Sequence, residues 1–441
     1  MSSVQEPPGL PLMGHLPAFL ADKLGFLLSC ADRYGDVVKL RLGEPTYLLT
    51  DPEDIRHVLT GNPANYNKTP RLTSARGRRL SGSGLQTSFG ADHLRQRRLL
   101  QPIFQRRVAE SFFDAMLRRI ASETAHWTDG AEVEIAREME MLALSIIIDS
   151  LFGEDFPDAE KLAAAITIRR SYIEYIYGAL VPFPEYLPAK IVLQYRRAQR
   201  TIDEIIYREI GTQKSANNLA AMLSTVTYPD GARMTQGQVR DEILSLMSTG
   251  YETIGDALSW TLYLLALHPS IESAVVDELR EVLRGEPPQV ADIPRLRYTR
   301  MVFDESMRLY PPTWIFVRMA VDNDQLPSGA AIPRGSKLYL CQYVMHRRPR
   351  YFPEPERFDP ERFNEEARES HPRFAYFPFG GGPRTCIGEQ FALLEGISIL
   401  AALLPRFQFL LEPGQTIVPR PTITLRPKNG IRVRIQSRRA D

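Results

Sequence analysis

The pattern of apolar and polar positions along the chain predicts a mainly helical protein. Apolar residues recur at helical spacing over long segments, and the longest runs from 235 to 268, between a Thr235/Gln238 capping box and Pro269. At 1.5 Å per residue such a helix would be roughly 50 Å long. Further helices are predicted at 91–126, 132–152, 159–178, 190–210, 270–284, 296–309 and 387–404.

Strand-like patterns are shorter and fewer. They occupy 37–42, 46–50, 336–343 and 431–435, so the predicted fold class is mainly α with a minor β region. The length of 441 residues would allow two or three domains of ordinary size. No linker, low-complexity tract or long repeat divides the chain, and residues 1–441 are therefore interpreted as a single domain.

Composition narrows the function only slightly. Lys and Arg (54) nearly balance Asp and Glu (53), which gives no sign of a nucleic-acid partner. The three cysteines are scattered and form no CxxC pair, so neither a disulfide framework nor a zinc site is expected. The proline-rich N-terminus lacks the roughly 20 apolar residues of a membrane span and the order of a signal peptide. We therefore expect a cytoplasmic protein with no membrane anchor.

One cysteine stands in an unusual setting, in the stretch FPFGGGPRTCIGEQFALLEG at 377–396. The glycines fit neither a dinucleotide-binding pattern nor a P-loop, and Pro383 removes a backbone donor that a phosphate would need. Taken alone, Cys386 would be interpreted as a small buried apolar residue. However, its position just ahead of a predicted helix favours the thiolate, and the glycines let a flat ligand approach beside the cation of Arg384. These features indicate a thiolate ligand to the metal of a planar cofactor.

The same stretch carries a resemblance. Residues 379–388, FGGGPRTCIG, resemble the haem-binding signature of the cytochrome P-450 family, the haem-thiolate monooxygenases, in its soluble bacterial form. The resemblance implies haem b (iron protoporphyrin IX), buried between the long central helix and the helix after the cysteine. It makes Cys386 the axial iron ligand, with Phe379, Arg384 and Gly388 also at the cofactor.

A second motif lies in the predicted helix 296–309. Glu305 and Arg308 share a helical face and would alone be a routine ion pair. The segment PERFDPERF at 355–363 resembles the family segment that adds a second arginine to this pair. By its position we choose Arg362 over Arg357 for that structural role.

The long helix contains a third motif, TGYETI at 249–254, which resembles the oxygen-activation segment of the family. The hydroxyl of Thr253 can bond back to its own helix and open a local bulge. The adjacent Glu252 can then hand protons to dioxygen as its O–O bond breaks. Two residues differ from the usual pattern, since Glu252 replaces Asp and Ile254 replaces a second Thr.

The resemblance also implies cations for the two haem propionates. His93 and Arg97 are spaced i,i+4 and match an early propionate-binding helix of the family, whereas Arg318 and Arg384 match two further contacts. The alternative for each is a solvated surface side chain.

A family member of this kind inserts one oxygen atom from O2 into its substrate, using two electrons from NAD(P)H. The chain ends soon after 431–435, so we expect a separate ferredoxin or flavodoxin with an NAD(P)H-dependent reductase. A haem-thiolate isomerase or dehydratase, or a haem-based ligand sensor, would not consume O2. The Glu252/Thr253 pair favours O2 activation over both.

The predicted substrate is a lipophilic molecule. Fatty-acid hydroxylation is the first hypothesis, with terpenoid or polyketide oxidation close behind. An aromatic or apolar stripe is more often core than pocket, but the resemblance places one set of residues at the pocket: Ser245, Ser248, Thr249, Ile315, Phe316 and Ile423.

Overall fold

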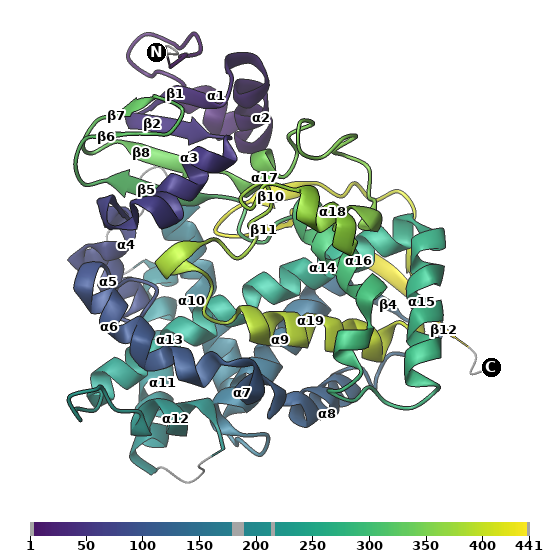
Figure 1. Ribbon diagram of the computed structural model, residues 1–441. Coiled ribbons are helices and arrows are strands. Elements are labelled where there is room, and N and C mark those ends of the chain that lie inside the picture. Colours follow the sequence, from purple (N-terminus) through teal and green to yellow (C-terminus); the bar gives the residue numbers. More distant parts are fainter. Residues whose placement is uncertain (1–3, 179–188, 213–216, 439–441) are drawn as a thin grey trace. The chain divides into compact units, whose positions relative to one another are not determined.

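The structure is a computed structural model that describes residues 4–178, 189–212 and 217–438. Helices predominate, and the described residues also form four small sheets, which confirms the predicted fold class. The chain divides into two compact units (Figure 1). The first contains Met1–Thr73 and Arg300–Ile387, and the second contains Ser74–Thr299 and Gly388–Asp441. The single domain over residues 1–441 stays a prediction.

The first unit is organised around a five-stranded sheet. β1 and β2 form an antiparallel hairpin across Gly43, and β2 pairs in parallel with β8, Thr46 opposite Lys337. One face of the sheet packs against buried side chains such as Ile55 and Phe352. The strand order is β1 (Val37–Leu42), β2 (Glu44–Leu49), β8 (Lys337–Leu340), β5 (Phe316–Ala320) and β3 (Tyr66–Asn67).

Short helices complete this unit. The π-helical turn His57–Gly61 follows α3 and packs against the turn Gly382–Arg384. A second small sheet pairs β6 (Asp324–Gln325) with β7 (Ala331–Ile332). The α-helices are α1 (Leu16–Ala21), α2 (Lys23–Tyr34), α3 (Pro52–Arg56), α4 (Pro70–Thr73), α16 (Arg297–Leu309, from Arg300 onward), α17 (Gln342–Met345) and α18 (Glu365–Ser370).

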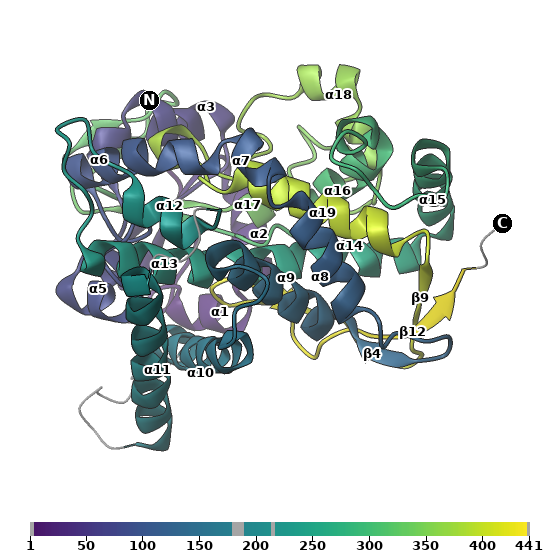
Figure 2. The ribbon, with the colours of Figure 1, turned by 90° about the horizontal axis from the view of Figure 1, so that it is seen from below.

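The second unit is a helical assembly in which α14 lies along α9 (Figure 2). A Cβ at Gly255 would lie 2.8 Å from the Cα of Glu140, so only glycine allows this close crossing. The helices are α5 (Ala75–Ser81), α6 (Gly90–Leu100), α7 (Arg106–Glu110), α8 (Phe113–Glu123), α9 (Ile135–Phe152), α10 (Ala159–Gly178), α11 (Lys190–Thr212), α12 (Leu219–Thr225), α13 (Gln236–Gly250), α14 (Glu252–Leu267), α15 (Pro269–Leu283) and α19 (Glu389–Leu403).

Two small sheets close this unit. β4 (Glu132–Glu134), β12 (Arg432–Ser437) and β9 (Phe407–Leu411) form one, with β12 in the centre. β10 (Pro419–Pro421) and β11 (Leu425–Pro427) form an antiparallel pair. The tip between β10 and β11 carries Thr424, which is buried.

Two long helices predicted from the sequence are interrupted. The segment 235–268 begins at the expected Thr235/Gln238 capping box, but it divides into α13 and α14 at Tyr251. The segment 91–126 divides into α6, α7 and α8, because Pro102 lies in a 3-10 turn after α6. The first interruption falls within the motif TGYETI, next to Thr253.

Candidate active site

The loop around Cys386 presents its thiol ahead of a long helix. Cys386 is exposed, and its backbone N–H donates to the Phe379 carbonyl at 2.9 Å. A Cβ at Gly382 would overlap the Leu59 carbonyl oxygen, and the backbone there has φ of +66°. Glycine is therefore required for the loop to lie this close to the π-helical turn. Gly388 is the N-cap of α19, which begins three positions after Cys386, so the cysteine lies just ahead of a helix, as the sequence predicted.

Three cations of the first unit act on one another near this loop. The buried Arg318 side chain has its pKa lowered to about 10, by burial and then by the positive charge of Arg384. Burial also lowers the pKa of Arg384 to about 10. The pKa of Lys68 is lowered well below its ordinary value by burial and by both arginines. Like charges gathered in this way are stabilised by an anion.

The donor set fits the cofactor that the sequence predicted. An accessible thiol, a glycine loop that a side chain would obstruct, and clustered cations suit a planar metal cofactor with acidic side arms. These features are the ones expected of a haem-thiolate site, and the role of each residue there stays a prediction. Lys68 was missed from the sequence because no motif surrounds it.

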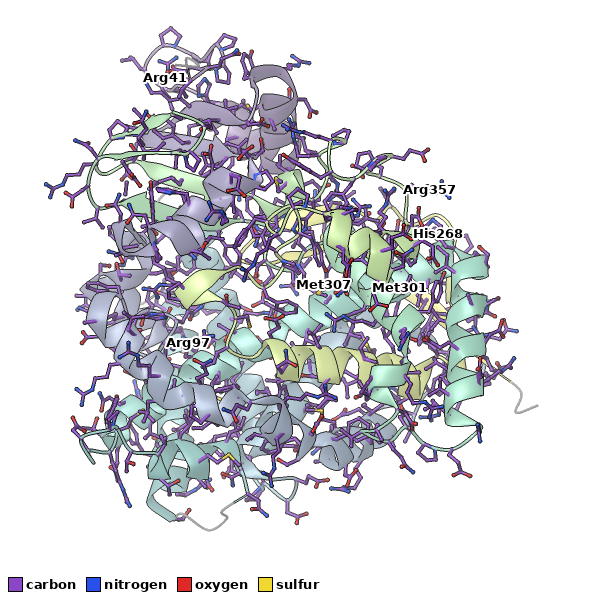
Figure 3. All side chains as sticks on the ribbon, in the orientation of Figure 1. Arg41, Arg97, His268, Met301, Met307 and Arg357 are labelled. Carbon is purple, nitrogen blue, oxygen red and sulfur yellow. The ribbon has the colours of Figure 1, made fainter. Side chains whose placement is uncertain are left out.

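The other predicted propionate contacts lie in the second unit. His93 is buried on α6, and Arg97 follows one turn later on the same helix (Figure 3). Their spacing matches the predicted helical face. Their role at the propionates stays a prediction.

The Glu305/Arg308 pair is completely buried. Arg308 donates to both carboxylate oxygens of Glu305, at 2.6 and 2.9 Å, and to the His346 carbonyl at 2.8 Å. Arg362 Nε lies 3.6 Å from Glu305 Oε1. Arg357 instead directs its side chain to Glu354 at 3.3 Å and is exposed (Figure 3). The geometry therefore supports Arg362 as the second arginine.

The interruption between α13 and α14 has the local chemistry expected of the motif TGYETI. The Thr253 hydroxyl donates to the Thr249 carbonyl at 3.0 Å, and the Thr249 hydroxyl donates to the Ser245 carbonyl at 2.9 Å. Thr249 is exposed and Thr253 is half-buried, so this helical face is open. The Ser248 hydroxyl does not share this arrangement and instead accepts a hydrogen bond from Arg169 at 2.9 Å.

The remaining predicted pocket residues lie on separate elements. Phe316, on β5, packs against the Cys386 loop, where a Cβ at Gly380 would lie 3.2 Å from its ring. Ile315 precedes it and is half-buried. Ile423 is 41% exposed at the tip between β10 and β11, in the second unit. The pocket as a whole stays a prediction.

Glu252 turns into the second unit. Its carboxyl is buried and accepts from the Thr424 hydroxyl at 3.0 Å, and burial raises its pKa. Asp256, one turn further along α14, is also buried. Burial and the negative charge of Glu252 raise the pKa of Asp256 to about 8. The sequence reasoning missed Asp256, although i,i+4 carboxyls in an apolar helix were a usable signal.

Two arginines lie between this pair and two further carboxylates. Arg426 donates to Glu174 at 2.6 Å and to Glu140 at 3.0 Å. Arg170 bonds Glu140 and lies 3.9 Å from Glu174. Both guanidinium groups are thus already paired with carboxylates other than Glu252 and Asp256.

Comparison with known proteins identifies the family. Residues 4–434 match the family model described as Cytochrome P450. The chain is 35% identical to a cyclooctatin synthase of Streptomyces melanosporofaciens, over 95% of this chain and 92% of that protein. It is 31% identical to a pentalenene oxygenase of Streptomyces avermitilis, over 98% and 97%. The fold matches a cytochrome P450DA heme domain with a TM-score of 0.89 at 25% identity, over 99% of this chain and 98% of that chain.

The chain therefore belongs to the cytochrome P450 family. It is a monooxygenase, an oxidoreductase that incorporates oxygen from O2 into lipophilic substrates, and haem b is its cofactor. In the part of the chain that the structure describes, no helix is long and apolar enough to cross a membrane.

Proposed function

We propose that this protein oxidises a terpenoid, with Cys386 as the iron ligand and electrons from a separate protein donor. The observation that carries the proposal is the Cys386 loop, which presents an accessible thiol and also carries Arg384, one of the mutually repelling cations Lys68, Arg318 and Arg384. These cations would hold the haem propionates. Haem supplies the iron that activates O2, and a thiolate ligand favours O–O cleavage over reversible binding.

The chain's own residues would handle protons. Thr253 holds its hydroxyl on the open face of the helix interruption through its bond to the Thr249 carbonyl. Glu252, the next residue back, carries a carboxyl whose pKa is raised by burial, which makes it a better proton donor than an ordinary surface carboxylate. Together they would present one hydroxyl and one acid to the reacting oxygen.

The ligand assignment is tested by Cys386→Ser. The ferrous CO complex of the parent should show the red-shifted Soret band of thiolate ligation, and the variant should lose it. Cys30→Ala is the matched control, because Cys30 is a buried thiol on α2 and its loss should leave the band in place. Retention of the band in Cys386→Ser would exclude this cysteine as the ligand.

The substrate class is supported by the relatives. Their names are those of terpene-oxygenating enzymes, including pentalenene oxygenase, and they align over nearly the whole chain. For this reason we propose terpenoids before the fatty acids that were the first hypothesis from the sequence. In a screen for shifts of the haem absorption band, cyclic terpenes should bind at least about tenfold more tightly than fatty acids of equal carbon number, a difference of about 1.4 kcal/mol. Shifts with fatty acids alone would refute the terpenoid assignment.

An acidic ferredoxin or flavodoxin is the proposed electron donor, with α6 and α7 as its docking face. Arg95 is held by Asp230 at 3.0 Å and Arg106 by Glu110 at 2.7 Å. Arg98 and Arg107 are also exposed and, among the described residues, form no ion pair. They are therefore available to steer an acidic partner.

Charge reversal tests this face. The double variant Arg98→Glu/Arg107→Glu should slow first-electron transfer from the protein donor at low salt. Its difference in rate from the parent should shrink as added salt shortens the Debye length to about 8–10 Å. Reduction by dithionite should not change. Arg200→Glu, an exposed cation on α11, is the control. If the double variant and the Arg200→Glu control are reduced by the protein donor at equal rates, the donor docks elsewhere.

A further inference from the structure

Two carboxyl groups on α14 are buried in the same environment. Glu252 and Asp256 are one turn apart, on one face of the helix, and are only 5% and 6% exposed. The Thr424 hydroxyl donates to Glu252 at 3.0 Å, and Thr424 is also near enough to Asp256 to lower the pKa of its carboxyl. Two like charges this close and this deeply buried are costly to ionise together.

The charged groups around the pair relieve this cost only in part, because burial raises the pKa of both carboxyls by more than Arg170 and Arg426 lower it. Asp256 Oδ2 is buried and, among the described residues, has no hydrogen-bond partner. Tyr251 adds a neutral phenol beside Glu252, with its pKa raised by burial. The groups facing the pair from the packed elements are Glu140 on α9, Arg170 and Glu174 on α10, and Arg426 on β11.

The charge balance favours one bound proton. Among the residues that the structure describes, the four carboxyl groups of Glu140, Glu174, Glu252 and Asp256 interact with two guanidinium groups, those of Arg170 and Arg426. Both arginines bond Glu140, and Arg426 also bonds Glu174. The Glu252–Asp256 pair is therefore left with an excess of negative charge, which binding of one proton halves.

We propose that Glu252 and Asp256 share one proton across the Thr424 hydroxyl, and that Asp256 is the positioning residue that stores this proton for Glu252. In the transfer, the Asp256 O–H gives its proton to the Thr424 oxygen while the Thr424 O–H gives its proton to a Glu252 carboxylate oxygen. Asp256 becomes the carboxylate, Glu252 becomes the acid, and no electrons move. A proton from solvent then restores Asp256.

The proposal deepens the proposed function and rests on it, since Glu252 is the acid beside Thr253. A stored proton allows Glu252 to be recharged without waiting for solvent to enter. The raised pKa of Asp256, about 8, agrees with a carboxyl that is protonated at neutral pH. Gly255 allows α9 to approach closely enough for Glu140 to join the group.

Two variants separate storage of the proton from its transfer. Asp256→Asn keeps the size and polarity of the side chain but has no titrating proton. Thr424→Val keeps both carboxyls and removes the bridging hydroxyl. Ser259→Ala is the matched control, because Ser259 is another completely buried hydroxyl on α14, bonded to the Gly255 carbonyl at 2.6 Å.

Infrared spectroscopy of the holoenzyme tests storage without turnover. The parent and Thr424→Val should show a carboxylic acid C=O band that disappears as pH rises through about 8, whereas Asp256→Asn should lack that band. Glu242, whose burial raises its pKa to about 7, contributes a band common to all variants, so difference spectra are required. An unchanged titrating band in Asp256→Asn would overturn the proposal.

Product formation tests transfer. Asp256→Asn and Thr424→Val should each form about tenfold less product per NAD(P)H, a smaller loss than the roughly 100-fold or more of a direct general acid, because Glu252 remains. Coupling in the parent should fall as pH rises through about 8, and Asp256→Asn should lose this dependence. If both variants form as much product per NAD(P)H as the parent, Asp256 does not supply protons to Glu252. That result would leave the proposed function unchanged. Failure of the parent itself to form product would overturn the proposed function, although the infrared band would still report the shared proton.

Discussion

Each unit of this protein buries a cluster of acidic and basic side chains, and the two clusters differ in charge balance. In the first unit, both oxygens of Glu305 accept hydrogen bonds from Arg308, and Oε1 also accepts from the Asp359 backbone N–H at 2.9 Å. In the second unit, Asp256 keeps an oxygen that no described residue bonds, and carboxyls outnumber guanidiniums.

The difference separates two uses of buried charge. Burial raises the pKa of Glu305 as well, but hydrogen bonds from Arg308 and the Asp359 backbone oppose that rise. A carboxylate whose oxygens are all bonded in this way fixes the backbone segments it touches. A buried carboxyl pair with too few hydrogen-bond donors has a raised pKa, so it can bind and release a proton during the reaction. The first cluster is therefore suited to rigidity and the second to chemistry.

The largest effect on stability should come from removing an arginine from the first unit's cluster. Arg308→Leu leaves Glu305 buried and charged without its partner, which should lower the free energy of unfolding by about 3–5 kcal/mol. Urea unfolding of the purified protein, or its failure to retain haem, measures this. Arg357→Leu is the control and should change stability by less than about 0.5 kcal/mol, because that side chain is 63% exposed. Equal losses for the two variants would contradict a structural role confined to Arg308.

The next effect should appear in chemistry with little change in stability. Thr253→Ala removes the hydroxyl on the open face, so haem content and NAD(P)H consumption should persist while product falls about tenfold or more and peroxide rises. Thr261→Ala is the control, since Thr261 makes the same backward bond, to Ala257 at 2.7 Å, but is fully buried. Undiminished coupling in Thr253→Ala would remove it from the proton path.

The effect that is smallest per step is a change in the free energy of unfolding with each pH unit. The pKa of Asp256 is about 8 in the folded chain and about 3.9 in an unfolded one, so the folded state binds more protons between these values. Stability should therefore fall as pH rises from about 4 to about 8, by at most about 1.4 kcal/mol per pH unit from this group. The urea midpoint of Asp256→Asn should depend less on pH across this window. Parallel curves for parent and variant would show that Asp256 does not titrate there.

Local patterns predicted the parts of the fold that depend on nearby residues. The strand predicted at 37–42 is β1, with the same bounds, because its alternation and its hairpin partner are adjacent in sequence. The strand β5 was not predicted, since Arg318 interrupts its apolar pattern and its partners β8 and β3 are distant. The capping box and the Thr253 backward bond were local and are present.

The candidate site divides in the same way. Cys386 and the Glu305/Arg308 pair could be named from short motifs. Lys68 could not, because its significance comes from neighbours that the fold supplies. The i,i+4 spacing of Glu252 and Asp256 signals a carboxyl pair but not the groups that surround it. For Asp256 the decisive neighbour is Thr424, 168 positions later in the chain, and no local periodicity reports such a pairing.

The order of strands in the first unit also affects how the protein is made. Thr46 on β2 pairs with Lys337 on β8, so about 290 residues must be synthesised between the two partners. At about 5–20 residues per second, the nascent β1–β2 hairpin waits about 15–60 s with one edge unpaired and Leu48 and Leu49 unburied. Yield in a host cell should therefore depend on chaperones that protect the early chain and on translation speed, independently of how stable the finished enzyme is.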